Sequence, residues 1–162
     1  MTNIIRPIAG AVANYTSCGF TAADFNSLAN ASVAVMPTTA NIDNTTNLDD
    51  YIDVSFSFAN GATTTVATSF FALFLLPLNQ DGTTYGDGAT TGSTQPGVSY
   101  WVTNANTRSG ITSGGTLVGT FPTVWLPRKR FILAIANMTG GALNASAAAA
   151  VQYNTTNLNG NG

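Results

Sequence analysis

The stretch Tyr51-Ile52-Asp53-Val54-Ser55-Phe56-Ser57-Phe58 decides the fold class of this chain. Every second residue is aliphatic or Phe, and the residues between them carry a hydroxyl or a carboxylate. Successive side chains of a β-strand point to opposite faces, so this alternation predicts one apolar face and one polar face. Half-buried strands of this kind are typical of antiparallel sheets, which commonly leave one face in water. We therefore predict an antiparallel β-protein.

The next apolar segment, Thr65–Leu76, changes from alternation to an almost continuous apolar run that starts at Phe70. A run of this kind predicts a strand that is covered on both faces. Further short strands, each rich in β-branched, aromatic or aliphatic residues and bounded by turn-forming residues, are predicted at Ser32–Met36, Val98–Thr103, Leu117–Leu126 and Phe131–Ala136.

The C-terminal part predicts a hairpin. Gly140-Gly141 is a strong turn signal, and we expect it to join the strand Phe131–Ala136 to a strand within Ala142–Tyr153. One short helix is expected near residues 22–31, because Thr21 can cap it and Asp24 lies in its first turn.

These elements predict an all-β chain that forms a single antiparallel β-sandwich or jelly roll, with at most that one short helix. A length of 162 residues favours one domain. We expect an N-terminal arm over residues 1–20, the β-sandwich domain over 21–153 and a C-terminal tail over 154–162.

The composition is unusual in its charge. Charged residues make up 7% of the chain, against about 25% in a typical soluble domain, whereas the apolar share of 44% is ordinary. Polarity comes from Thr, Asn, Ser and Gly instead. A neutral polar surface loses its water at lower cost than a charged one, because burying a hydroxyl or an amide costs less than burying an ion. With a net charge of −2, copies also repel one another little. The composition therefore favours a protein that packs against neighbours.

The chemistry of most enzymes is missing from the sequence. There is no His and no Glu, so Ser-His-Asp and Cys-His arrangements cannot form. The single Cys18 allows no disulfide within the chain, and we interpret it as a small buried apolar residue. We expect no enzyme activity, no cofactor and no metal. The few basic residues argue against nucleic-acid binding, and the longest apolar run is too short to cross a membrane.

The segment Asn79–Gly97 predicts a long exposed loop, and long ordered loops usually contact something. Its Asp81-Gly82 and Asp87-Gly88 pairs are typical of turns, although carboxylates at these positions are also suited to Ca²⁺. A glycan-binding β-sandwich is a second hypothesis for the whole protein, with the aromatic rings of Tyr85, Tyr100 and Trp101 as stacking platforms.

Two further features are candidate partner contacts. Arg128, Lys129 and Arg130 are three of the five basic residues and precede an apolar strand. They are either solvent-exposed residues at the start of the strand, which protect it from aggregation, or a positively charged patch that binds an acidic partner. The apolar residues Ile4, Ile5 and Ile8 predict that the N-terminal arm docks on a neighbouring subunit.

Three stretches of the sequence belong together by their order and spacing. The first runs from Phe25-Asn26-Ser27-Leu28-Ala29-Asn30 to the segment Asn41–Tyr51. The second is Phe74-Leu75-Leu76-Pro77 with the loop Asp81–Gly88. The third is Leu126-Pro127-Arg128-Lys129-Arg130-Phe131, followed by Asn137–Ser146. Together they resemble small virion structural proteins of tailed bacteriophages.

The resemblance covers roughly residues 25–153. It implies a β-sandwich subunit of the capsid decoration (cement) type that binds the major capsid protein, often as a homotrimer, and stabilises the virion after synthesis in the host cytoplasm. A tail or baseplate subunit is the alternative within this resemblance. The Asn-rich segment 154–162 departs from the pattern and leaves the partner surface open.

Overall fold

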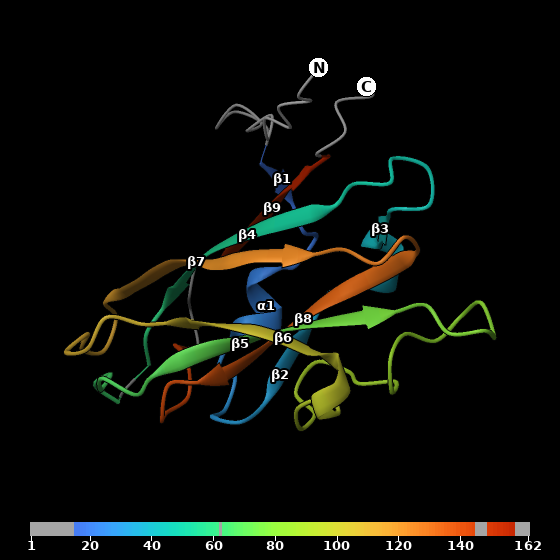
Figure 1. Ribbon diagram of the computed structural model, residues 1–162. Coiled ribbons are helices and arrows are strands. Elements are labelled where there is room, and N and C mark those ends of the chain that lie inside the picture. Colours follow the sequence, from blue (N-terminus) through green and yellow to red (C-terminus); the bar gives the residue numbers. More distant parts are fainter. Residues whose placement is uncertain (1–14, 62, 145–148, 158–162) are drawn as a thin grey trace, which may run out of the picture.

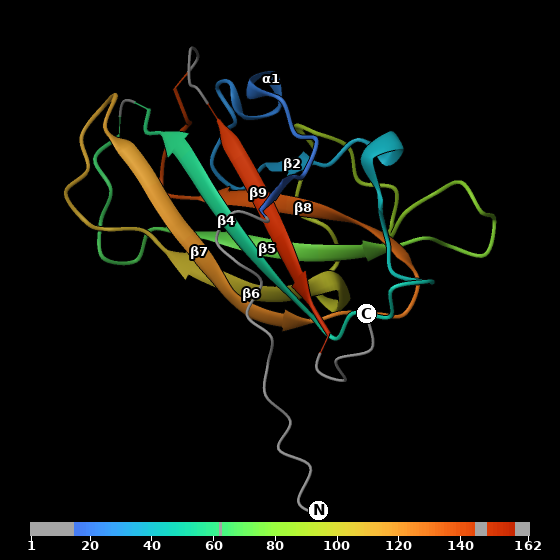
Figure 2. The same cartoon turned by 90° about the horizontal axis from the view of Figure 1, so that it is seen from above.

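Two antiparallel sheets pack face to face in the computed structural model, which describes residues 15–61, 63–144 and 149–157 (Figure 1). The first sheet has the strand order β1 (Thr16–Ser17), β9 (Ala150–Thr156), β4 (Tyr51–Ala59) and β7 (Thr116–Trp125). The second sheet has the order β2 (Val33–Val35), β8 (Arg130–Met138), β5 (Phe70–Pro77) and β6 (Trp101–Asn106), and β3 (Ile42–Asp43) also pairs with β8. In Figure 2, β7, β4 and β9 lie in front of β5, β6 and β8. The predicted all-β sandwich is confirmed.

The strand pairs are nested along the chain. β1 pairs with β9, β2 and β3 pair with β8, β4 pairs with β7, and β5 pairs with β6, all antiparallel. The first strand thus meets the last and the middle strands meet each other, as in one long hairpin rolled up. This arrangement, split over two packed sheets, is the jelly-roll topology.

The predicted C-terminal hairpin is wrong. β8 belongs to the second sheet and β9 to the first, so the chain crosses between the sheets after Gly140-Gly141 instead of turning back on itself. A glycine turn signals a reversal but not which sheet receives the next strand. β9 pairs instead with β4, from Tyr51↔Thr156 to Ser57↔Ala150.

The core lies between the two sheets and is rich in phenylalanine. β4 alternates between half-buried and buried side chains, as its sequence predicts. Its inward residues Phe56 and Phe58 meet Phe71 of β5 edge to face, with ring centroids 5.0 and 4.9 Å apart, and Phe121 of β7 lies 5.2 Å from Phe56. Edge-to-face and tilted pairs at these distances are favourable beyond their buried area.

The strand β5 is covered on both faces, which confirms the second prediction from the sequence. Its residues from Phe71 to Leu76 are all buried, and β8 is buried on both faces over Phe131–Asn137. One face of these strands meets the core. The other face, on the outside of the second sheet, lies beneath the loop that follows β5.

Several predicted boundaries move. The helix α1 is a single turn, Ala22–Phe25, and Thr21 donates its backbone N–H and its hydroxyl to the Asp24 carboxylate at 2.8 and 2.9 Å. The strand expected at Val98–Thr103 begins only at Trp101, because Val98–Tyr100 forms a 3-10 turn.

The ends of the chain also differ from the expected division. Thr16 and Ser17, expected in the arm, form β1, and residues 154–156, expected in the tail, belong to β9. No helix in the described parts of the chain is long and apolar enough to span a membrane.

Candidate functional site

The outer face of the first sheet presents a row of neutral side chains. The register of β4 with β7 and β9 places on it the residues that we call the neutral face: Tyr51, Asp53, Ser55, Ser57, Thr116, Val118, Thr120, Trp125, Gln152 and Asn154. Asp53 is the only charged residue in these three strands. Its carboxylate accepts a hydrogen bond from the Thr123 hydroxyl at 2.6 Å, so even this charge is held within the face.

Large apolar groups are exposed on the neutral face. Trp125 is 65% exposed and Val118 is 68% exposed. Tyr51 lies across from Trp125 on β4, and their ring centroids are 4.3 Å apart. Val118 lies opposite Ser57, toward the other end of β4 from the Tyr51–Trp125 pair, so the face carries exposed apolar groups at two separate points. Exposed apolar groups on an otherwise polar face can be buried against a partner. The sequence did not predict them, because Trp125 and Val118 occupy the polar positions of an otherwise ordinary half-buried strand.

The outer face of the second sheet is covered by the loop that contains residues 79–97. The Gly92 N–H donates to the Val33 carbonyl at 2.8 Å, and the Val33 N–H donates to the Ser93 carbonyl at 3.1 Å. Gly86 has a positive φ of 54°, and a Cβ there would lie 2.8 Å from Leu76 Cδ2. Only glycine lets the loop come this close to β5 without strain. Most residues of the loop are exposed, as expected, but it contacts its own sheet at Tyr85–Gly86 and at Gly92-Ser93.

This docking corrects one candidate residue. Tyr85 is only 7% exposed, so its ring belongs to the core and cannot serve as an exposed stacking platform. Tyr100 is half-buried and packs against the core. Trp101 is 51% exposed and is the member of the three whose ring is open to solvent.

The carboxylates of the loop make turns. Asp81 accepts hydrogen bonds from the backbone N–H groups of Thr83 and Thr84, both at 2.9 Å, and Asp87 accepts from Ala89 and Gly97 at 3.2 and 2.8 Å. A hydrogen bond from the Thr84 hydroxyl is the main cause that lowers the pKa of Asp81 to about 2. Among the described residues no group of three or more His, Cys, Asp or Glu side chains comes together. The turn interpretation of these residues is confirmed.

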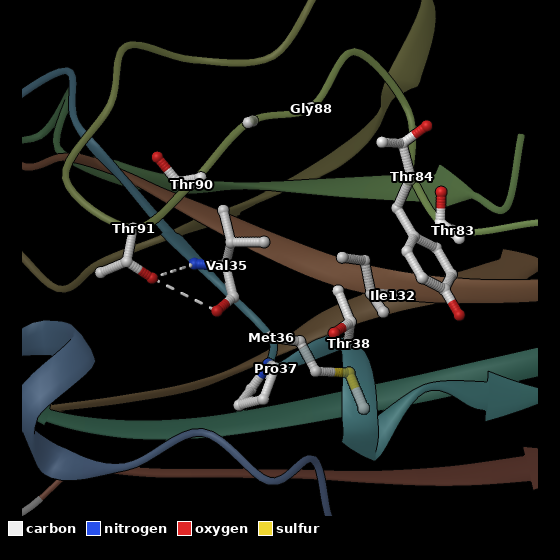
Figure 3. Close-up of a pocket in the computed structure, with 12 residues that line it drawn as sticks. Val35, Met36, Pro37, Thr38, Thr83, Thr84, Gly88, Thr90, Thr91 and Ile132 are labelled. Carbon is white, nitrogen blue, oxygen red and sulfur yellow. Dashed lines mark hydrogen bonds between the residues drawn. The ribbon is translucent and has the colours of Figure 1, made fainter. Parts of the chain in front are cut away.

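Two hollows flank the docked loop. The first has a volume of about 310 Å³ and is shown in Figure 3. Its floor is apolar, with Val35, Met36 and Ile132, and threonines line its rim. The Thr91 hydroxyl is already engaged with the backbone N–H and carbonyl of Val35, at 3.0 and 3.3 Å. None of the lining residues carries a charge.

The second hollow has a volume of about 300 Å³ and lies over β5 and β6. Its lining includes Trp101 and the loop residue Val98, which is 90% exposed. Within this hollow the indole N–H of Trp101 donates to Asn104 Oδ1 at 2.9 Å. The structure thus places Trp101 beside a cavity and separates it from Tyr85.

Two of the three residues of the basic cluster Arg128–Arg130 lie beside carboxylates. Arg130 Nε donates to Asp43 Oδ2 at 2.7 Å, and Arg128 lies 3.9 Å from Asp50. Hydrogen bonds from the Thr45 hydroxyl and then from Arg130 lower the pKa of Asp43 to about 2. Lys129 is exposed. This arrangement favours the interpretation of these residues as a solvent-exposed start of the strand over that of a patch that binds an acidic partner.

One further predicted residue, Cys18, can be placed. Cys18 is fully buried, and burial raises the pKa of its thiol to about 12, which confirms the interpretation as a small core residue. Ile4, Ile5 and Ile8 lie outside the described residues.

No known protein family matches this chain, and no curated protein shows significant similarity to it. Function must therefore be argued from the fold and from these surfaces.

Proposed function

We propose that this protein is a structural subunit that docks on the surface of a bacteriophage capsid and stabilises it as a decoration subunit. The neutral face is the observation that carries this proposal. It combines exposed Trp125 and Val118 with hydroxyl and amide groups and holds one tethered carboxylate. Such a surface can be buried against a partner without the cost of desolvating ions.

The size of the face bears on how the subunit binds. Three strands about 4.8 Å apart, with about nine residues at ~3.3 Å each, cover roughly 400 Å². A stable interface usually buries about 800 Å² on each partner. We therefore propose that the face acts together with the N-terminal arm, through Ile4, Ile5 and Ile8, and that the subunit binds as a homotrimer whose copies add avidity. The major capsid protein is the proposed partner.

A pelleting assay tests the docking surface. Particles stripped of the protein are mixed with the purified chain, and the bound fraction is measured after centrifugation. The variant Val118→Arg places a charge in the neutral face and should weaken binding at least about tenfold. Val98→Arg is the matched control, because it makes the same change at an exposed valine in the 3-10 turn before β6, away from the neutral face, and it should bind as the native chain does.

Equal loss of binding in both variants, or in neither, would contradict docking through the neutral face. Light scattering tests the trimer: a monodisperse monomer at micromolar concentration, together with single copies on the particle, would show that the oligomer is wrong.

A further inference from the structure

The hollow over β5 and β6 combines an exposed aromatic ring with an apolar floor. Phe70, Ala72 and Phe74 alternate along β5 and line it from the same face of the sheet. Ala72 has the smallest side chain of the three. The loop residues Gln95, Pro96 and Val98 and the β6 residues Trp101 and Asn104 complete the lining.

Trp101 is exposed although its polar group is satisfied. Because its indole N–H already donates to Asn104 Oδ1, the ring is held in one orientation and needs no polar ligand. The residue as a whole is 51% exposed. An indole face of this kind stacks well against the C–H groups of a sugar ring, and it leaves the sugar hydroxyls in water.

The lining contains two amide side chains, and in each of them one of the two polar atoms makes a hydrogen bond. The Gln95 Nε2 group donates to Met138 Sδ at 3.0 Å, and Asn104 Oδ1 accepts from Trp101. Within the described residues no hydrogen bond engages Asn104 Nδ2 or Gln95 Oε1. The hollow therefore has one such donor on β6, at Asn104, and one such acceptor on the loop residue Gln95, which contacts Met138 of β8. The strand β5 runs between β6 and β8, and the lining residues carry no charge.

From this arrangement we infer that the hollow binds a neutral N-acetylated sugar unit. The sugar ring stacks on Trp101, and the acetamido methyl group lies over Ala72. The acetamido carbonyl accepts from Asn104 Nδ2, and its N–H donates to Gln95 Oε1. A volume of about 300 Å³ is at the small end of ligand pockets and suits one sugar unit. This binding activity is independent of docking through the neutral face, which lies on the other sheet.

The test uses the full chain with Trp125→Phe, which leaves Trp101 as the only tryptophan. N,N′-diacetylchitobiose at millimolar concentration should shift and quench the Trp101 fluorescence, and calorimetry should give a saturable isotherm. Cellobiose has the same linkage but no acetamido group, so it should bind at least about tenfold more weakly. The deacetylated disaccharide, which is cationic, should be equally weak.

Two variants locate the site by calorimetry. Ala72→Leu fills the floor, and Trp101→Ala removes the platform. Each should weaken diacetylchitobiose binding at least about tenfold, whereas Ser55→Leu on the neutral face should leave it unchanged. If Ala72→Leu does not fold, as judged by circular dichroism, Trp101→Ala decides.

Three results would overturn the inference. The first is no binding of diacetylchitobiose by the native chain. The second is equal binding of cellobiose. The third is unchanged binding in Trp101→Ala. If no sugar binds and Trp101→Ala instead releases the protein from particles, the hollow is a protein contact and the sugar site is wrong.

Discussion

The buried side-chain amide of Asn137 donates a hydrogen bond to the backbone carbonyl of Leu28 at 2.8 Å. The same Nδ2 group donates to the Gly141 carbonyl at 2.8 Å, and Asn137 Oδ1 accepts from the N–H and hydroxyl of Thr139. Asn137 is 0% exposed, so this one side chain ties the end of β8 to the segment after α1 and to the glycine turn.

We expect Asn137→Ala to lower the free energy of unfolding by roughly 2–4 kcal/mol, because it leaves buried carbonyls without a donor. Urea denaturation measures the change. Asn106→Ala, at an exposed position of β6, is the control and should stay within about 0.5 kcal/mol of the native chain. A similar small change for both variants would show that the network contributes little.

Phe71 of the second sheet contacts two phenylalanine rings of the first sheet in the core. It is fully buried and touches the rings of Phe56 and Phe58 across the sandwich. Phe71→Ala should cost about 3–5 kcal/mol, since it removes a buried ring and leaves a cavity between the sheets. Val98→Ala changes an exposed side chain and should be nearly neutral in the same denaturation experiment. A loss below about 1 kcal/mol for Phe71→Ala would mean that the core can collapse around the missing ring.

The stability should depend on pH through Asp43. Its pKa in the folded protein is about 2, below the value of about 3.9 expected in the unfolded chain. A lowered pKa stabilises the fold when the carboxylate is ionised, so this contribution is present above pH ~4 and is lost as the pH falls towards ~2. The melting temperature of Asp43→Asn should therefore lie below that of the native chain at pH 7 and approach it near pH 2.

The causes of the lowered pKa can be separated. The hydrogen bond from the Thr45 hydroxyl acts more strongly than the one from Arg130. Thr45→Ala and Arg130→Gln should each reduce the pH-dependent difference, because each removes a hydrogen bond to the Asp43 carboxylate. An unchanged pH dependence in Thr45→Ala would show that the local turn does not hold the carboxylate ionised.

Binding to particles should depend little on salt. The neutral face has one charged residue, and exposed ion pairs contribute only about 0–1 kcal/mol each. Raising NaCl from about 0.1 to 1 M shortens the screening length from ~10 to ~3 Å, and we expect little loss of bound subunit. A steep release with salt, abolished by replacing Arg128, Lys129 and Arg130 with Gln, would show that the basic cluster dominates binding and that the neutral face does not.

Local patterns in the sequence predicted the layers but not the connections. The alternation of Tyr51–Phe58 and the apolar run that starts at Phe70 specify which faces are buried, because side-chain direction is a local property of a strand. Pairing of β9 with β4 instead of β8 depends on which edge is open after the rest of the sheet has formed. No feature of the glycine turn encodes that choice.

The sites were predictable to a smaller extent. The sequence predicted Trp101 in a strand and as a stacking platform, but its partners Phe70 and Ala72 come from a strand about 30 residues earlier and meet it only through the β5–β6 pairing. Tyr85 carried the same signal and is buried, because the loop folds back over its own sheet. An aromatic side chain alone does not reveal whether a loop is docked.

The nested strand order has a consequence for synthesis. β1 lies at residues 16–17 and its partner β9 at residues 150–156, so the first sheet cannot be completed until almost the whole chain has left the ribosome. At about 5–20 residues per second, the N-terminal segment waits for roughly 8–30 s. During this time β4 and β5 have been made, but the edge that β9 will occupy is open. The nascent chain therefore exposes an unpaired strand edge on β4 until β9 has been made.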